Sequence, residues 1–183
     1  GSLRRVPRPW TEKFSVWRPQ DLFADLLLRD LRFRGISVDS AVVRFAAAPP
    51  TAFSLGSVRR PLADVLSATN KASNNLCAEA VLRALCFGTG RKTSCVAASD
   101  GIAAMMTILA KHGIRCDDIA LRDGSGISFY DLVSAASIGR VLRGIAAHST
   151  FPLFRESLAI GGGDGTLANR MTSLPYRQVF RGK

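Results

Sequence analysis

The sequence is poor in the residues that usually bind metal ions. Only two histidines, His112 and His148, occur in the 183 residues, and no two of the four cysteines have Cys-x-x-Cys spacing. Zinc sites in proteins usually draw about four ligands from such closely spaced Cys and His residues. We therefore expect no metal site and no metal cofactor.

The cysteines leave the redox state open. Cys77 and Cys86 stand among apolar residues, where a reduced cysteine usually acts as a small core side chain. In an oxidising compartment, a disulfide between Cys86 and Cys95 around the intervening polar loop is the alternative. Both states stay open, as does the state of Cys116.

Long hydrophobic runs are absent as well. The apolar stretch Ile102–Ala110 is followed directly by Lys111. It is far shorter than the roughly 18 residues that a membrane-spanning helix needs. The sequence therefore predicts no transmembrane segment. No segment resembles a secretory signal peptide, but this leaves the localisation open, because a trimmed chain would lack one.

Negative charge is scarce. The chain has 25 Lys and Arg against 14 Asp and Glu, which gives a net charge of +11. A basic surface suits nucleic acid, an anionic membrane or an acidic polymer, and it is equally compatible with no charged partner. The basic residues are scattered, and no zinc-finger or RNP-like pattern occurs. The sequence therefore gives little support to nucleic-acid binding.

The composition is that of a globular protein, with 47% hydrophobic and 21% charged residues. The length suits one domain or part of a larger one. Gly1-Ser2 is typical of the scar that tag cleavage leaves, so residues 1–18 are interpreted as this scar and a basic segment. Residues 19–183 are expected to form the main domain.

Hydrophobic periodicity, capping residues and breakers predict helices interspersed with short strands. Helices are predicted at residues 20–33, 61–71, 73–85, 101–112, 133–147, 152–158 and 165–171. Strands are predicted at residues 14–17, 36–38, 41–45, 52–58, 119–121 and 176–180. This pattern favours an α/β fold class of the mixed α+β kind, in which a helical region is combined with short antiparallel strands.

Three short segments carry candidate chemistry. The first is Asn70–Glu79 (NKASNNLCAE), in which a Ser-x-Asn sequence starting at Ser73 runs into a predicted helix. The second is Asp123–Ser128 (DGSGIS), and the third is Gly163–Arg170 (GDGTLANR). Each segment alone has a local explanation. Ser73 or Asn75 is the expected cap of the helix at 73–85, the second segment is a glycine turn, and Asp164 is the expected cap of the helix at 165–171. The third is no phosphate-binding loop, because no Gly-Lys-Ser/Thr follows its glycines. The apolar set expected for the helix at 73–85 is Leu76, Ala80, Val81 and Leu85.

Together and in this order, the segments resemble the D-alanyl-D-alanine carboxypeptidases of the penicillin-binding protein 4 type. In that family the Ser-x-Asn loop runs into an Asn-Leu-x-Ala-Glu helix, and Asp-Gly-Ser-Gly-Leu-Ser and Gly-x-Asp-Gly-Thr-Leu segments follow. A strand with Lys-Thr-Gly comes next, and Lys183 stands where its lysine is expected. The middle residue of Ser-x-Asn is more often aspartate in the family, whereas this chain has Asn74. The resemblance covers residues 19–183.

The resemblance implies a partial penicillin-binding, transpeptidase-like domain. It also implies an exported or periplasmic serine D-Ala-D-Ala carboxypeptidase/endopeptidase that acts on peptidoglycan peptides through an acyl-enzyme and is trapped by β-lactams. Such enzymes take their nucleophile from Ser-x-x-Lys. No serine of this sequence has a lysine three residues later. The family places that motif before residue 1, so the chain is expected to be a fragment that is inactive alone.

The resemblance also assigns roles to individual residues. Ser73 is expected to relay a proton to the leaving amine, Asn75 to hold the peptide amide, and Lys183 to bind a carboxylate or steady the Ser73 hydroxyl. Asp123 and Ser125 are candidate substrate-binding residues because their segment lies near the active site in the family. No metal or organic cofactor is implied.

Two rival functions come from other classes. One is a non-catalytic peptidoglycan-binding or scaffold protein that kept the fold but lost the serine, and the other is the nucleic-acid-binding domain. A sheet that ends at Lys183 leaves a strand edge unpaired, which invites pairing with another chain. A homo-oligomer or a complementing chain is therefore a further expectation.

Overall fold

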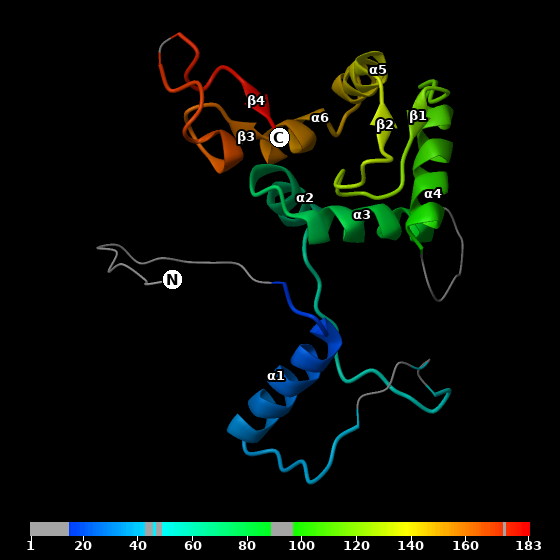
Figure 1. Cartoon of the computed structure of the whole chain (residues 1–183), viewed down its shortest axis with the longest axis vertical. Coiled ribbons are helices and arrows are strands. Elements are labelled where there is room, and N and C mark those ends of the chain that lie inside the picture. The colour runs from blue at the N-terminus through cyan, green and yellow to red at the C-terminus, as the bar shows by residue number, and fades with distance from the viewer. Residues whose placement is uncertain (1–14, 43–45, 47–48, 89–96, 174) are drawn as a thin grey trace. The chain divides into compact units, whose positions relative to one another are not determined.

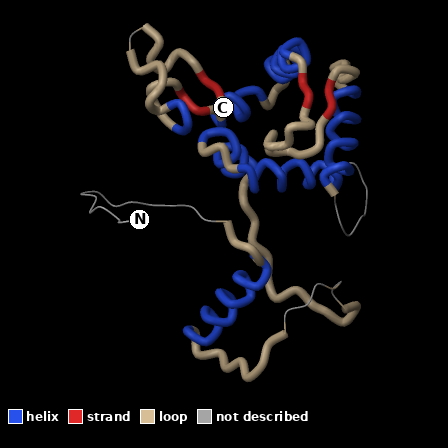
Figure 2. Tube along the Cα trace, viewed as in Figure 1, coloured by secondary structure: helices blue, strands red, loops and turns tan. Residues whose placement is uncertain are grey.

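The computed structural model describes residues 15–42, 46, 49–88, 97–173 and 175–183. Internal contacts divide the chain into two compact units, Gly1–Gly56 and Ser57–Lys183. Helices predominate, and the strands are short and antiparallel (Figures 1 and 2). The predicted fold class, helices combined with short antiparallel strands, is thereby confirmed.

The first unit contains one helix, α1 (Pro19–Phe33), within its described residues. Proline suits the first helical position because its missing N–H has no partner there. The helix ends before Gly35, whose φ of +79° closes it without Cβ strain. The apolar periodicity of this segment therefore predicted the helix to within one residue. Its apolar side chains remain largely exposed, and Phe23 is 69% exposed.

The second unit begins with three helices, α2 (Leu62–Lys71), α3 (Asn75–Gly88) and α4 (Ala98–Lys111). Helix α3 packs against both of the others (Figure 1). Leu82 on α3 and Ala104 on α4 are buried. A Cβ at Gly101 would lie 2.5 Å from the carbonyl oxygen of Leu82, so glycine allows α3 and α4 to approach closely.

The remainder of this unit holds two small sheets and three helical elements. Strands β1 (Ile119–Ala120) and β2 (Leu132–Val133) pair antiparallel. Strands β3 (Ala159–Ile160) and β4 (Arg181–Gly182) also pair antiparallel, with Ala159 opposite Gly182. The helical elements, in chain order, are α5 (Ala135–Ala146), α6 (Phe151–Ser157) and the 3₁₀ helix η1 (Gly165–Leu167). Helix α6 packs on α2, and η1 lies beside β3.

Several predicted elements were wrong. Residues 15–17, 36–38 and 52–58 form no strand, and residues 175–179 form turns instead of the predicted strand. The strand lies slightly later, at Arg181–Gly182, where the chain pairs with β3. The described parts of 41–45 show no strand, and residues 43–45 lie outside the described residues. A β-branched or aromatic run becomes a strand only where a partner strand is available.

The buried face of α3 also differs from the predicted one. The sequence suggested Leu76, Ala80, Val81 and Leu85 as the apolar set. The structure buries Ala78, Leu82 and Cys86, which repeat every four residues, and leaves Leu76 79% exposed. Apolar residues occur all round this helix, so periodicity alone did not single out the face.

Candidate active site

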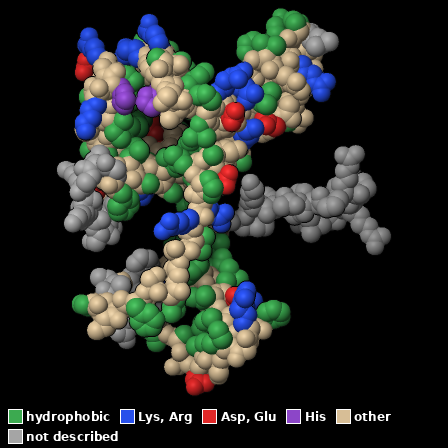
Figure 3. Space-filling model, turned by 180° about the vertical axis from the view of Figure 1, so that it is seen from behind, with side chains coloured by type: hydrophobic (Ala, Val, Ile, Leu, Met, Phe, Trp, Pro, Cys, Tyr) green, Lys and Arg blue, Asp and Glu red, His purple; other side chains and the backbone are tan. Residues whose placement is uncertain are grey.

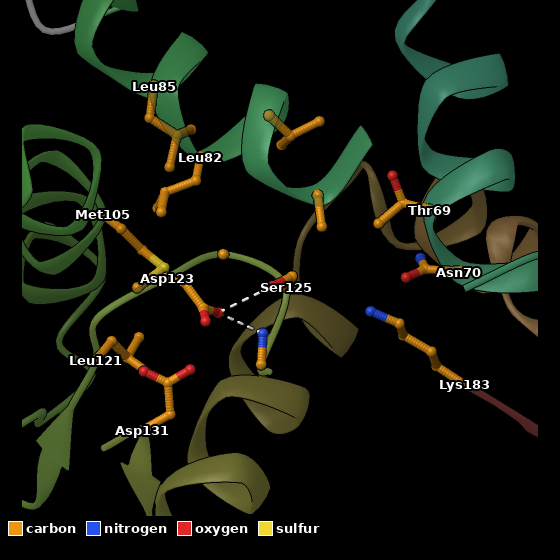
Figure 4. Close-up of a pocket in the computed structure, with 14 residues that line it drawn as sticks. Thr69, Asn70, Leu82, Leu85, Met105, Leu121, Asp123, Ser125, Asp131 and Lys183 are labelled. Atoms are coloured by element: carbon orange, nitrogen blue, oxygen red, sulfur yellow. Dashed lines mark hydrogen bonds between the residues drawn. The ribbon is translucent and has the colours of Figure 1, made fainter. Parts of the chain in front are cut away.

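A pocket of about 430 Å³ lies between the end of α2, the body of α3 and the loop between β1 and β2 (Figure 4). Its apolar wall is formed by Ala78, Val81, Leu82, Leu85, Met105 and Leu121. Its polar lining includes Thr69, Asn70, Asp123, Ser125, Asp131 and Lys183. Segments more than 100 residues apart in the sequence therefore meet around one cavity.

Glu79 on α3 anchors the β1–β2 loop to the helix. Its Oε1 atom accepts hydrogen bonds from the backbone N–H groups of Gly124 (2.8 Å) and Ser125 (3.0 Å). Its Oε2 atom pairs with Arg83, one helical turn away. The hydrogen bond from Arg83 lowers the pKa of Glu79, and the two amides act in the same direction against partial burial. Glu79 is therefore an ionised anchor of the loop.

Asp123 folds the turn that borders the pocket. Its Oδ1 accepts from the N–H of Gly126 at 2.5 Å and from the Ser125 hydroxyl at 3.2 Å, and its Oδ2 accepts from the N–H of Ser128 at 2.8 Å (Figure 4). Burial raises the pKa of Asp123, but these donors outweigh it, so the pKa is lowered overall. Gly126 has a φ of +74°, which the turn requires.

Asp131 stands at the other end of the same loop. Its Oδ1 accepts from the backbone N–H of Arg122 at 2.5 Å, which closes the loop next to β2. Its Oδ2 is buried and has no hydrogen-bond partner among the described residues.

The Ser-x-Asn segment forms the corner between α2 and α3. Ser73 has a left-handed φ of +51°, which for a residue with a Cβ costs about 1–2 kcal/mol. Asn74 caps α3, because its Oδ1 accepts from the N–H of Cys77 at 3.1 Å. The sequence predicted that Ser73 or Asn75 would be the cap, and this was wrong. The side chains of Ser73 and Asn75 are consequently not used in capping, and both residues are exposed.

The pocket brings together some of the predicted site residues. Asp123, Ser125 and Lys183 line it, and the Lys183 side chain extends toward it from the end of β4, beside Asn70 (Figure 4). Ser73 and Asn75 are not among the lining residues, although Ser73 stands only three residues after Asn70. The structure thus places Lys183, the Asp123 turn and Asn70 around one pocket, and the Ser-x-Asn corner lies just beyond Asn70, after the end of α2.

Comparison with known proteins decides the family. The family model described as the D-Ala-D-Ala carboxypeptidase 3 (S13) family matches residues 1–183. The chain belongs to this family.

Three matches show the same relationship at the level of sequence and structure. The D-alanyl-D-alanine carboxypeptidase DacB of Haemophilus influenzae is 30% identical over 170 residues, covering 93% of this chain and 35% of that protein. The carboxypeptidase DacB of Mycolicibacterium smegmatis is 34% identical over 113 residues, covering 60% of this chain and 24% of that protein. The crystal structure of penicillin-binding protein 4 from H. influenzae in complex with a β-lactam matches with a TM-score of 0.78 and 31% identity.

The chain is much shorter than these S13 relatives. The match to the β-lactam complex covers 90% of this chain but only 38% of that chain. Both the resemblance to the penicillin-binding protein 4 type and the fold are confirmed by these matches. The activity of the whole protein is a separate matter, because the shared region is about a third of the relatives' length.

Sequence reasoning missed four residues that shape this S13 site. Glu79 was noted only as part of the motif, and Asn70, Lys71 and Asp131 were given no role. The sequence also predicted that Asp164 caps the short helix, and Asp164 does stand at the N-cap position of η1. Its side chain makes no cap hydrogen bond and instead accepts from the N–H of Ile160 and pairs with Lys71. The one available signal was the position of Glu79 and Lys71 within the family-like pattern around Ser73.

Other expectations concern residues remote from the pocket. Cys86 is fully buried, as expected of a core cysteine. The alternative Cys86–Cys95 disulfide involves Cys95, which lies outside the described residues.

No helix among the described residues is long and apolar enough to cross a membrane. Over the second unit, Lys and Arg side chains form several separate groups with hydrophobic side chains between them (Figure 3).

Proposed function

We propose that this chain is the Ser-x-Asn-bearing part of a serine D-Ala-D-Ala carboxypeptidase/endopeptidase that acts on peptidoglycan peptides through an acyl-enzyme. One observation carries the proposal: Lys183, Ser125 and Asn70 line a single pocket, although they come from three separate segments. Membership of the S13 family supplies the reaction type. The intact enzyme is then exported or periplasmic, and β-lactams acylate it.

Lys183 acts as the cation of the site. Its ammonium group extends toward the pocket beside Asn70, where it can bind the terminal carboxylate of a D-Ala-D-Ala peptide or steady the Ser73 hydroxyl. Ser125 donates its hydroxyl proton to Asp123, so its oxygen lone pairs face outward as acceptors for a peptide N–H. Asp123 is committed to holding the turn and stays ionised.

Ser73 and Asn75 supply the polar groups of the corner. The Ser73 hydroxyl relays a proton to the leaving amine, and the Asn75 amide holds the peptide. Two features support these roles: both residues are exposed, and Asn74 rather than either neighbour caps α3. The left-handed backbone of Ser73 is a further support, because strain of this kind is often kept at functional sites.

Acylation requires the nucleophilic serine of a Ser-x-x-Lys motif. No serine of this sequence has a lysine three residues later. We expect this chain alone to form no adduct with a penicillin. A longer protein that contains both this chain and a Ser-x-x-Lys segment should form one.

Covalent labelling by a fluorescent penicillin, read by gel and intact mass, tests the proposal. The longer protein should be labelled, and Lys183→Ala should slow its acylation by about 10²-fold or more. Lys111→Ala, at the exposed end of α4, removes a lysine remote from the pocket and should leave the rate unchanged. An adduct on this chain alone, or unchanged acylation in Lys183→Ala, would refute the proposal.

The second candidate is a non-catalytic peptidoglycan-binding or scaffold protein of the same fold, because a pocket lined by Lys183 and Ser125 can bind a peptide without an acylating serine. Its signature is co-sedimentation with purified peptidoglycan together with no penicillin adduct on the longest native product of the gene. Labelling of that product excludes this candidate.

A further inference from the structure

Lys71 and Asp164 join two of the family segments. Lys71 lies two residues before Ser73 at the end of α2, and Asp164 begins the Asp-Gly-Thr sequence of η1. The Nζ atom of Lys71 is 2.5 Å from Oδ2 of Asp164, and the two side chains are only 27% and 39% exposed. The contact spans 93 residues of sequence.

The second oxygen of Asp164 reaches the β3–β4 sheet. Oδ1 accepts a hydrogen bond of 2.7 Å from the N–H of Ile160, the last residue of β3. Ile160 is the register partner of Arg181 on β4, and Lys183 follows β4 directly. One carboxylate therefore contacts the corner that leads to Ser73 and also the sheet that carries Lys183.

The backbones at this junction are in close contact. Gly165 has a φ of +57°, and a Cβ built on it would lie 2.6 Å from the carbonyl oxygen of Lys71. Asn70, beside Lys71, donates a 2.7 Å hydrogen bond to the buried hydroxyl of Ser157 at the end of α6. The end of α2 is thus fixed by side-chain bonds from two consecutive residues and by backbone packing.

We infer that Lys71 and Asp164 are positioning residues that fix the Ser73–Asn75 corner relative to the β3–β4 sheet and so to Lys183. This inference rests on the proposed function, because it assigns these residues to the same reaction. An isolated surface ion pair contributes little to stability. This pair differs in two respects. The Asp164 carboxylate also accepts a hydrogen bond from the last residue of β3, and the backbone of Lys71 packs closely against Gly165.

Amide hydrogen exchange measured on this chain tests the coupling between the Lys71–Asp164 pair and the Ser73–Asn75 corner, and it requires no enzymatic activity. Asp164→Asn keeps an oxygen for the N–H of Ile160 but loses the charge that binds Lys71. We expect exchange at the N–H of Asn74 and Cys77 to accelerate by about tenfold or more, as the loss of a hydrogen bond between charged groups should give. Asp117→Asn removes the exposed pair with Arg115 and should leave both amides unchanged. Equal exchange at these amides in wild type and Asp164→Asn would overturn the inference.

Acylation of the longer protein by benzylpenicillin tests the consequence. Lys71→Met and Asp164→Asn should each slow acylation by about tenfold or more, and the double variant should be no slower than either, because both remove one contact. Lys71→Arg keeps the cation and should restore most of the rate. Additive losses, or wild-type rates in the single variants, would contradict positioning. An unlabelled wild-type protein would instead refute the proposed function, and exchange alone would then decide the coupling.

Discussion

The Oε1 atom of Glu79 accepts a 2.8 Å hydrogen bond from the backbone N–H of Gly124, which lies 45 residues later in the chain. A Cβ on Gly124 would lie 2.9 Å from the Cβ of Leu82 and 3.0 Å from the carbonyl oxygen of Ala78, so the loop runs directly along α3. The helix that follows Ser-x-Asn is therefore also the support of the Asp123 turn. Two family segments form one structural unit through this contact.

Removal of the Glu79 carboxylate should loosen that unit. Glu79→Ala leaves the amides of Gly124 and Ser125 without their acceptor, and we expect a loss of about 1–3 kcal/mol in the free energy of unfolding. Glu79→Gln keeps one oxygen and should lose less. Urea unfolding measures both, and Glu156→Ala, which removes an exposed carboxylate from α6, is the control. A Glu79→Ala protein as stable as the control contradicts this anchoring role.

The capping role of Asn74 gives a second prediction. Asn74→Ala removes the acceptor for the N–H of Cys77 and should destabilise the protein by about 1 kcal/mol. Asn74→Asp keeps the cap and adds a negative charge at the helix N-terminus, so its stability should equal or exceed that of wild type. Thermal unfolding of the three proteins in parallel measures this. The prediction fails if Asn74→Asp is destabilised as much as Asn74→Ala.

Acid should weaken the two carboxylate anchors. Lys71 holds the pKa of Asp164 below its ordinary range, and Arg83 does the same for Glu79. Because both pKa values are lower in the folded state, their stabilisation is complete above the ordinary carboxyl pKa of about 4 and is lost as the pH falls below it. Urea unfolding from neutral pH to about pH 3 should show this loss. The Glu79→Gln/Asp164→Asn variant should show a shallower decline, and an unchanged slope would count against the assignment.

The contact of Gly165 with Lys71 gives a matched pair of glycine variants. Gly165→Ala combines a positive φ with a Cβ 2.6 Å from a backbone oxygen, so we expect a loss of at least about 2 kcal/mol. Gly113→Ala has the same sign of φ, +69°, but nothing within 4 Å of the added Cβ. It should cost about 1 kcal/mol. Equal losses in the two variants, measured by urea unfolding, would show that the close approach is unimportant.

The helices were predictable from the sequence because their signals are local. Apolar spacing, Pro19 and Gly35 located α1 to within one residue. Among the strands, only β1 (Ile119–Ala120) was predicted, at residues 119–121. The other three were missed or misplaced, because each has only two residues, and a strand pattern needs about four to eight residues to be visible. Strand β4 forms where β3 offers a partner, which is a tertiary effect.

The site residues were predictable only where they belong to a short sequence motif of the family. The family resemblance located Lys183, Asp123 and Ser125, which the structure brings to one pocket. It gave no role to Glu79 or Lys71, because their partners are 45 and 93 residues away and a contact at that separation leaves no local pattern. The cap on α3 was misassigned, since Ser73, Asn74 and Asn75 are all good capping types and only the backbone geometry selects one.

The central claim is that Ser73 takes part in chemistry whereas its neighbour Asn74 only shapes the helix. Stopped-flow acylation of the longer protein by a fluorescent penicillin tests this most directly, with Ser73→Ala and Asn74→Asp compared under identical conditions. The claim predicts that Ser73→Ala slows acylation by about 10²-fold or more, whereas Asn74→Asp stays near the wild-type rate. Acylation of Ser73→Ala at the wild-type rate would contradict it.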